Sequence, residues 1–298
     1  MMRNLHNKSV FDAINKLLLT VMCISMLYPF IYVLAISFNE AADSSRGGIF
    51  FFPRHFTLDS YRIIFETNDL FHAALVSIGR TAIGTILTVL CSAMFAYAFT
   101  KPNYFFYKPM KVIFFVAMFL GTGALIPVYM LYRSLDMLNK FAVYILPVLI
   151  NTWFVILFRT YYLQLPTGLE EAAVIDGANE LHIFFRLILP LSKPMLATIG
   201  LFAAVDQWNA WRDTLFFTSS DSLKTLQFIM MEIMQKAQAS TVITRAAMRM
   251  SRVGQLKTVD PMSVRMAITI VTTIPIVLVY PFLQKYFIKG IFTGSIKG

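Results

Sequence analysis

Long apolar stretches without a charged side chain constrain this fold more than any other feature of the sequence. Residues 17–37 run 21 positions without a charge, which is enough for about 30 Å of helix, the thickness of a bilayer's hydrocarbon core. Over the whole chain 57% of residues are hydrophobic and 14% are charged, against about 25% charged in a soluble domain. We therefore predict an all-α integral membrane protein with most of the chain in lipid.

The apolar stretches predict six transmembrane helices in one membrane domain, residues 17–284. A polar segment, residues 1–16, precedes this domain, and a tail, residues 285–298, follows it. Prolines inside the predicted spans are compatible with helices, because neighbouring helices satisfy the carbonyls that a proline frees. The predicted spans are residues 17–37, 81–99, 112–131, 141–158, 195–217 and 266–283.

The charges of the predicted loops indicate the orientation. The 1–16 segment, the 100–111 turn and the tail lie on one side, and each carries three Lys or Arg, whereas the 38–70 loop holds five acids against three bases. The positive-inside rule, the usual orientation signal of inner-membrane proteins, then places both termini in the cytoplasm. The 166–194 loop becomes cytoplasmic and the 218–262 loop extracytoplasmic. Because the net charge of +10 comes largely from residues that flank spans, we expect no nucleic-acid partner.

The sequence gives no sign of chemistry carried by this chain. The two cysteines lie in apolar stretches and the four histidines are scattered, so we expect neither a disulfide nor a metal site. We find no P-loop, dinucleotide-binding turn or nucleophile elbow, and we expect no catalytic residue and no cofactor. If transport here uses ATP, another chain has to bind ATP and Mg²⁺.

The 166–194 loop is polar and lies between two apolar stretches, and it reads PTGLEEAAVIDGANELHIFFRLILPLSKP. Thr167 is a candidate cap for a first helix, and Gly177 is expected to end that helix in a turn of positive φ. Residues 178–188 then predict a second helix with an apolar face of Leu181, Phe184, Phe185 and Ile188. Two interpretations stay open on these grounds alone: a surface loop that packs under the bundle, and a bracket that binds a partner.

One spacing within this loop resembles a family signature. Glu171-Ala172-Ala173, then three residues, Gly177, then nine residues and LILP ending at Pro190 resembles the EAA signature of ATP-binding-cassette (ABC) importer permeases, with Leu187 where the family has isoleucine. Residues 123–129 (GALIPVY), 208–211 (WNAW) and 287–290 (FIKG) look like segments of the carbohydrate-uptake permeases. The likeness covers nearly the whole chain and is nearest to the polysaccharide importers, those for alginate among them.

The resemblance implies a type I ABC importer architecture in which the 166–194 loop inserts into a groove on a cytoplasmic ATPase. Glu171 would pair with a basic residue of that ATPase, Gly177 would allow the sharp turn, and Ala172 and Ala173 would allow close approach. Asp176 and Pro190 complete the coupling set. The implied partners are a second homologous permease, two ATPase subunits, an extracytoplasmic solute-binding protein and a carbohydrate, with alternating access as the mechanism. The saccharide remains open between an acidic polymer such as alginate and a neutral oligosaccharide.

The predicted fifth span contains polar residues at membrane depth. Asp206 lies about 16 Å from the start of this span, and ionisable residues at such depth usually face a protein interior or a water-filled cavity. We expect a substrate pathway there; the alternative is a helix that ends early, with Arg212 and Asp213 in the outer interface and its tryptophans as interface anchors. The predicted pathway residues are Asp206, Gln207, Trp208, Asn209, Trp211 and, from the fourth span, Asn151.

Two further expectations concern basic residues. Arg80 and Arg265 lie near the outer ends of predicted spans, where long side chains extend toward water. The basic run at 245–257 is either a solvated helix face, a surface for an acidic binding protein, or a guide for an anionic substrate. Rival functions are an ion-gradient-driven secondary transporter, which would have ten or more spans or an inverted repeat, and an integral membrane enzyme.

Overall fold

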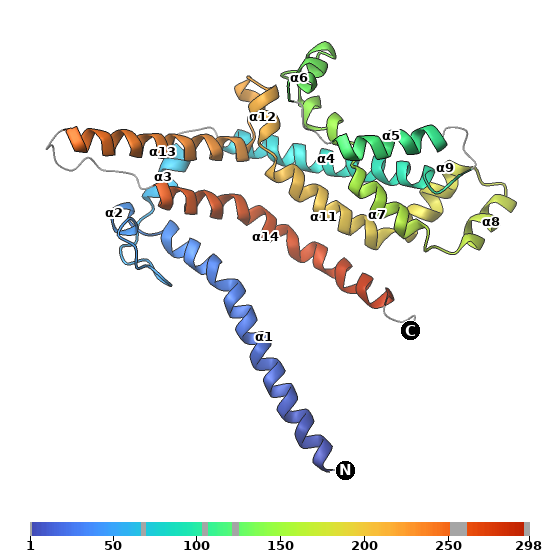
Figure 1. Ribbon diagram of the computed structural model, residues 1–298, viewed down its shortest axis with the longest axis horizontal. Coiled ribbons are helices and arrows are strands. Elements are labelled where there is room, and N and C mark those ends of the chain that lie inside the picture. The colour runs from blue at the N-terminus through green and yellow to red at the C-terminus, as the bar shows by residue number, and fades with distance from the viewer. Residues whose placement is uncertain (1, 67–69, 103–106, 121–124, 251–260, 295–298) are drawn as a thin grey trace. The chain divides into compact units, whose positions relative to one another are not determined.

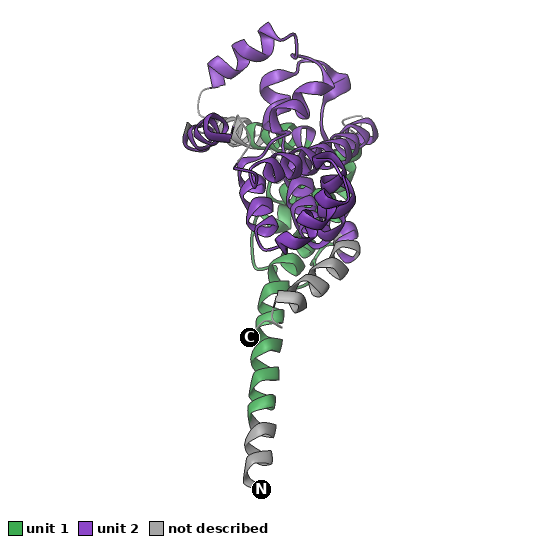
Figure 2. Cartoon of the chain, turned by 90° about the vertical axis from the view of Figure 1, so that its right-hand side faces the viewer, with its two compact units in different colours: residues 1–68, 230–274 green, residues 69–229, 275–298 purple. Residues whose placement is uncertain are grey.

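The computed structural model describes residues 2–66, 70–102, 107–120, 125–250 and 261–294, and the regular elements in these ranges are helices. The chain divides into two compact units (Figure 2). The first unit comprises residues 1–68 and 230–274, and the second comprises residues 69–229 and 275–298. The helices α13 (Leu226–Met250) and α14 (Pro261–Gly294) each cross a boundary between the units.

Three helices in the described residues are long and apolar enough to cross a membrane: Phe11–Ser37, Leu70–Ala98 and Pro261–Val279. Two bent helix pairs bring the number to five if each pair is one span. They are Phe141–Val148 with Thr152–Tyr162, bent by 44°, and Glu180–Leu191 with Lys193–Asn209, bent by 82°. Broken helices are tolerated at membrane depth where protein or a water-filled cavity surrounds the break.

The first unit contains the long helix α1 (Met2–Ser37) (Figure 1). Large apolar side chains of this helix are exposed between Phe11 and Leu34, as in a helix surrounded by lipid. Two short helices follow it, α2 (Ala41–Ser44) and α3 (Asp59–Glu66). The buried Asn39 organises the loop between them, because its Oδ1 accepts hydrogen bonds from the backbone N–H groups of Arg54 and His55 at 2.8 and 2.9 Å.

The second unit is built around α4 (Leu70–Ala98), which packs most extensively against α7 and α11. The 166–194 loop and α11 follow α7 in the chain, so that the loop lies at the end of these packed helices (Figure 1). The remaining elements of this unit are α5 (Tyr107–Leu120), α6 (Leu125–Ser134), α7 (Thr152–Tyr162), α8 (Thr167–Ile175), α9 (Glu180–Ile183), α10 (Leu189–Leu191), α11 (Lys193–Asn209), α12 (Arg212–Phe217) and the short 3₁₀ turns Phe141–Tyr144, Leu146–Val148 and Asp221–Leu223.

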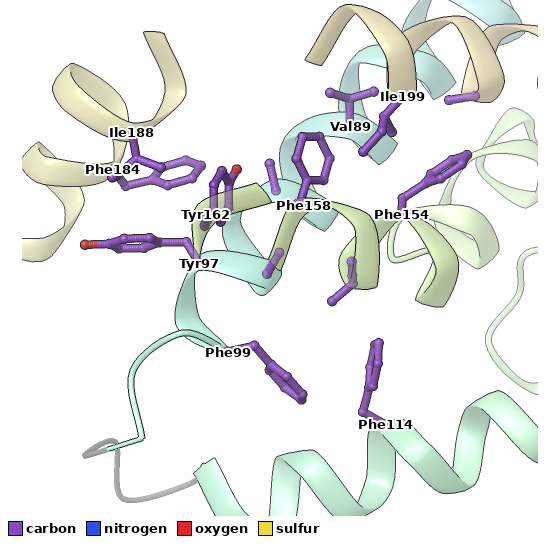
Figure 3. Close-up of a cluster of buried hydrophobic side chains, with 14 of the residues drawn as sticks. Val89, Tyr97, Phe99, Phe114, Phe154, Phe158, Tyr162, Phe184, Ile188 and Ile199 are labelled. Atoms are coloured by element: carbon purple, nitrogen blue, oxygen red, sulfur yellow. The ribbon is translucent and has the colours of Figure 1, made fainter. Parts of the chain in front are cut away.

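An aromatic core joins the 166–194 loop to the helices of the second unit (Figure 3). The Tyr97 ring of α4 lies 5.5 Å from the Phe184 ring of the loop and 6.4 Å from the Tyr162 ring of α7, between centroids. Tyr162 in turn stacks on Phe158 at 5.8 Å. Offset and edge contacts of this kind add stability beyond the area that they bury. The loop is therefore a packed part of the second unit.

Several predicted boundaries differ from the structure. The helix that contains the second predicted span begins at Leu70 rather than near residue 81, because the segment before Arg80 continues the same helix. The third predicted span includes residues 121–124, which lie outside the described residues, and its described parts form α5 and α6. The fourth begins as two 3₁₀ turns, and only α7 is regular α-helix.

Candidate functional site

Arg80 is the centre of a polar cluster inside the second unit. It is 1% exposed and lies on α4 one helical turn from Gly84. Its Nε donates to Gln207 Oε1 at 2.8 Å and its Nη1 to the backbone oxygen of Ala210 at 3.0 Å, while its Nη2 forms an ion pair with Asp213. The guanidinium also lies 4.5 Å from the centroid of the Tyr144 ring. The expectation that Arg80 extends toward water is wrong, because this cluster satisfies its donors inside the protein.

A break between two helices creates this environment. The helix α11 ends at Asn209, Ala210 is extended, and α12 begins at Arg212. The C-terminal end of α11 carries partial negative charge and unpaired carbonyls, which stabilise the Arg80 cation. Asp213, in the first turn of α12, supplies the opposite charge. Asp213 therefore belongs to a different helix from Asp206 and Asn209.

Close packing of α4 on α11 depends on Gly84. A Cβ atom at this position would lie 2.6 Å from Nε2 of Gln207. The missing side chain leaves room for Gln207, whose Nε2 also donates to the backbone oxygen of Tyr144 at 3.3 Å. Gly84 thus allows the side-chain amide of Gln207 to form hydrogen bonds with both Arg80 and the backbone of Tyr144.

The Arg80 cluster borders a cavity of about 210 Å³, here called the polar cavity. Three of the six predicted pathway residues line it: Asn151, Asp206 and Gln207. Asn151 also caps α7, where its Oδ1 accepts from the backbone N–H groups of Trp153 and Phe154. The residues that line the polar cavity are Arg80, Thr88, Val148, Asn151, Phe154, Ala203, Asp206, Gln207, Ala210 and Asp213.

The other three predicted pathway residues lie elsewhere in the second unit. Trp208 is buried and lines an apolar hollow of about 390 Å³ together with residues such as Ile78 and Pro275. Asn209 is exposed, and its Oδ1 accepts a hydrogen bond from Gln227 at 3.2 Å. Trp211 precedes α12, with the Arg212 guanidinium 5.8 Å from its ring centroid.

The 166–194 loop forms a bracket of two helices with a tight turn between them. The first helix, α8, ends at Ile175, and Gly177 adopts a φ of 80°, which confirms the turn that the glycine predicts. Thr167 does not cap this helix, because Pro166 occupies the cap position. The second helix instead begins at Glu180, where Asn179 Oδ1 accepts from the N–H of His182 at 2.8 Å.

The apolar face of the second helix differs from the prediction. The buried residues are Ile183, Phe184 and Ile188, whereas Leu181 and Phe185 are exposed. The reason is a π-helical turn at Phe184–Ile188, which shifts the spacing of the buried face. The helix then continues through Pro190 to Leu191, and the chain bends at Ser192 before α11.

The two adjacent glutamates of α8 have different surroundings. Glu170 forms an ion pair with Lys101, which lies three residues after the end of α4, and both side chains are partly buried. Glu171 is exposed, as are Ala172, Asp176, Gly177 and Pro190, while Ala173 is partly buried against the aromatic core. A hollow of about 480 Å³ opens beside this tip, lined by residues that include Asp176, His182 and Arg186. The bracket is held from inside by Glu170 and presents Glu171 to solvent.

Comparison with known proteins identifies the family. The chain is 34% identical to the polygalacturonan/rhamnogalacturonan transport system permease protein YtcP of Bacillus subtilis (strain 168), over 97% of this chain and 99% of that protein. The chain belongs to the permease components of carbohydrate ABC importers. The permease is also 28% identical to the arabinooligosaccharides transport system permease protein AraQ of Halalkalibacterium halodurans, over 91% of each chain. No protein-family model matches the chain.

A solved structure supports the same assignment. The permease matches a chain of a bacterial ABC transporter involved in the import of the acidic polysaccharide alginate, with a TM-score of 0.76 and 26% sequence identity. The match covers 94% of this chain and 97% of the other. Membership of the family makes the permease a multi-pass protein of the inner membrane and implies ATPase and solute-binding partners. A secondary transporter driven by an ion gradient is not supported.

Sequence reasoning did not predict the burial of Arg80 at the polar cavity. It also did not predict the ion pair of Lys101 with Glu170 that holds the 166–194 loop. For Arg80 a signal existed, since it is the only Lys, Arg, Asp or Glu among the 29 residues of α4. Extending the second span to Leu70 would have placed it inside the membrane and marked it as a residue in need of a partner. Lys101 carried no comparable signal, because a lysine after a span is ordinary.

Proposed function

We propose that the permease forms one half of a type I importer with six membrane spans, both termini in the cytoplasm and the 166–194 loop on the cytoplasmic side. The other half is a second, homologous permease. Two ATPase subunits bind ATP and Mg²⁺ below the membrane, and an extracytoplasmic solute-binding protein delivers a saccharide. This chain itself does no covalent chemistry. Support comes from the family, from the broken helices and from the charges of the loops.

Coupling to ATP rests on the tip of the 166–194 loop. One observation carries this proposal: Glu171 is exposed beside a turn of positive φ at Gly177, while the neighbouring Glu170 is used inside the protein. A rigid bracket with small residues at its tip can enter a groove deeply. An ion pair from Glu171 to the ATPase then fixes the register of docking more than it adds affinity. Closure of the ATPase pair on ATP would move the bracket and open the pathway outward.

The substrate pathway includes the polar cavity. Asp206 is exposed there, with Asn151 and Gln207 beside it, and carboxylate and amide groups suit hydrogen bonds to sugar hydroxyls. The transported molecule is an oligosaccharide or polysaccharide, and an acidic polymer such as alginate is our first expectation. Its support is the names of the relatives, one a transporter of polygalacturonan and rhamnogalacturonan and another an importer of alginate.

The coupling role is tested by reversing the charge of Glu171. The complex is purified with its ATPase and binding protein, reconstituted in proteoliposomes and supplied with oligogalacturonate, oligoalginate, arabinooligosaccharide or maltose. Glu171→Arg should abolish both ATP-driven uptake and saccharide-stimulated ATP hydrolysis. The control is Asp59→Arg, a reversal at an exposed acid of α3, which should leave both intact. Normal uptake by Glu171→Arg would contradict the coupling role.

A second variant tests the pathway separately. Asp206→Asn keeps the size of the side chain and removes its charge, so assembly and basal ATP hydrolysis should persist while the uptake of the saccharides changes in rate or in preference between acidic and neutral substrates. Unchanged uptake of every saccharide in the panel would remove Asp206 from the pathway.

A further inference from the structure

A lysine at the end of α4 connects the two halves of the 166–194 loop to the membrane helices. Lys101 Nζ forms an ion pair with Glu170 Oε2 of α8 and lies 3.7 Å from Glu180 Oε2 of α9. Tyr97 of α4 donates its hydroxyl to the same Glu180 oxygen at 2.6 Å. The Lys101 ammonium also lies 5.0 Å from the centroid of the Tyr97 ring. We call these four residues the Lys101 clamp.

The position of the lysine is set by the backbone. The N–H of Lys101 donates to the carbonyl of Ala98, and Thr100 Oγ1 donates to the carbonyl of Tyr97, so the chain turns tightly where α4 ends. Pro102 follows and cannot continue a helix with its own N–H. The lysine side chain is 22% exposed, against 28% for Glu170 and 45% for Glu180. Partial burial strengthens such contacts relative to an ion pair at the surface.

Two acids on separate helices meet at one cation. Without Lys101, the carboxylates of Glu170 and Glu180 would lose the cation that they share, while the aromatic core would still hold the bracket. With Lys101, both arms of the bracket contact one residue just beyond the end of α4. The residues of the clamp are separate from the exposed tip that contains Glu171 and Gly177.

The other part of α4 holds the polar cavity. Arg80 lies 17 residues before Tyr97, which is about 26 Å along a helix. The helix α4, which contains both points, packs against α7 and α11. A displacement of the bracket that reaches α4 through the clamp is therefore carried along one helix to the Arg80–Gln207–Asp213 contacts.

We propose that Lys101 is a positioning residue that transmits the displacement of the 166–194 loop to α4 and thereby to the polar cavity. This inference rests on the proposed coupling function, and it adds a residue that does not touch the ATPase or the substrate. Removal of the clamp should leave the ATPase bound and active, while ATP no longer rearranges the outer end of α4.

The test uses the reconstituted importer with Cys23 and Cys91 replaced by serine and a single reporter, Leu75→Cys, on an exposed position near the outer end of α4. The rate at which a water-soluble thiol reagent labels Leu75→Cys is measured without nucleotide and with ATP plus vanadate, so no saccharide is needed. In the importer that carries only the reporter changes, this treatment should change the labelling rate. Lys101→Met should reduce the change about tenfold, within the range of coupling between distant sites.

Matched variants separate the clamp from a general loss of structure. Lys101→Arg keeps the charge and should restore the ATP-dependent change, and Lys108→Met, at an exposed lysine of α5, should leave it intact. Co-purified ATPase and its basal activity should be unchanged in all three. A full ATP-dependent change in Lys101→Met would overturn the clamp. No change in the unmodified importer would overturn the coupling function itself, and the clamp with it.

Discussion

The 166–194 loop and the polar cavity present their functional residues in opposite ways. The tip of the loop exposes Glu171 and Gly177 on a short segment whose spacing is contiguous in sequence. The cavity instead brings together Arg80 and Asp213, which are separated by 133 positions and meet only after α4, α11 and α12 have packed. The surface that we propose for docking is therefore visible in a local pattern, whereas the interior cluster depends on tertiary contacts.

The largest effect is expected from a substitution at the polar cavity. Arg80→Ala removes a buried cation and leaves Asp213, Gln207 and the Ala210 carbonyl without their partner. Loss of one partner of a buried pair costs about 3–5 kcal/mol. We expect a lower unfolding temperature of the purified complex and loss of uptake. Unchanged values for both would contradict the central place of Arg80.

Two controls accompany this variant. Arg212→Ala removes an exposed arginine that contacts only the Trp211 ring among the interactions described, and it should change the unfolding temperature little. Arg80→Lys keeps the charge but loses the planar fork that reaches three acceptors. Its unfolding temperature should therefore lie between those of Arg80→Ala and Arg212→Ala.

A smaller effect is expected at the loop. Gly177→Ala places a side chain at a φ of 80°, which costs about 1–2 kcal/mol in the left-handed region. No atom lies within 4 Å of the added Cβ, so the cost is conformational rather than steric. Saccharide-stimulated ATP hydrolysis should fall, while the unfolding temperature of the complex shifts less than in Arg80→Ala.

The control for this variant is Gly168→Ala on α8, which also has open space around the added atom but no positive φ. Alanine favours a helix over glycine, so this variant should keep full stimulation. Equal effects of the two substitutions would show that the turn at Gly177 is not what the loop requires.

The smallest effect tests how the cavity is held. Gly84→Ala would place a Cβ 2.6 Å from the flexible end of Gln207, which has to turn away from Arg80. Because Arg80 keeps its contacts with Ala210 and Asp213, only the net contribution of one hydrogen bond is lost, about 0.5–1.5 kcal/mol. Uptake should decline with ATPase docking intact. Gly200→Ala on α11, where the space is open, is the matched control and should transport normally.

The sequence predicted much of the loop and less of the cavity, for identifiable reasons. The left-handed turn at Gly177 followed from a local rule. The buried face of the second bracket helix did not, because the π-helical turn at Phe184–Ile188 shifts its spacing. At the cavity, Asp206 and Gln207 were found because polar groups are rare at membrane depth. Arg80 was misplaced, since its burial depends on a helix break at Ala210 that apolar periodicity does not reveal.

The central claim, that the 166–194 loop docks on a cytoplasmic ATPase, is tested most directly by crosslinking in the assembled complex. A photoreactive amino acid is placed at Val174 of α8, which is 57% exposed, and for comparison at Leu135 after α6, which is 59% exposed. We predict that illumination links Val174 to the ATPase subunit and that Leu135 gives no such product. Absence of the ATPase product at Val174 in a complex that retains its ATPase, or equal products at both positions, would contradict the claim.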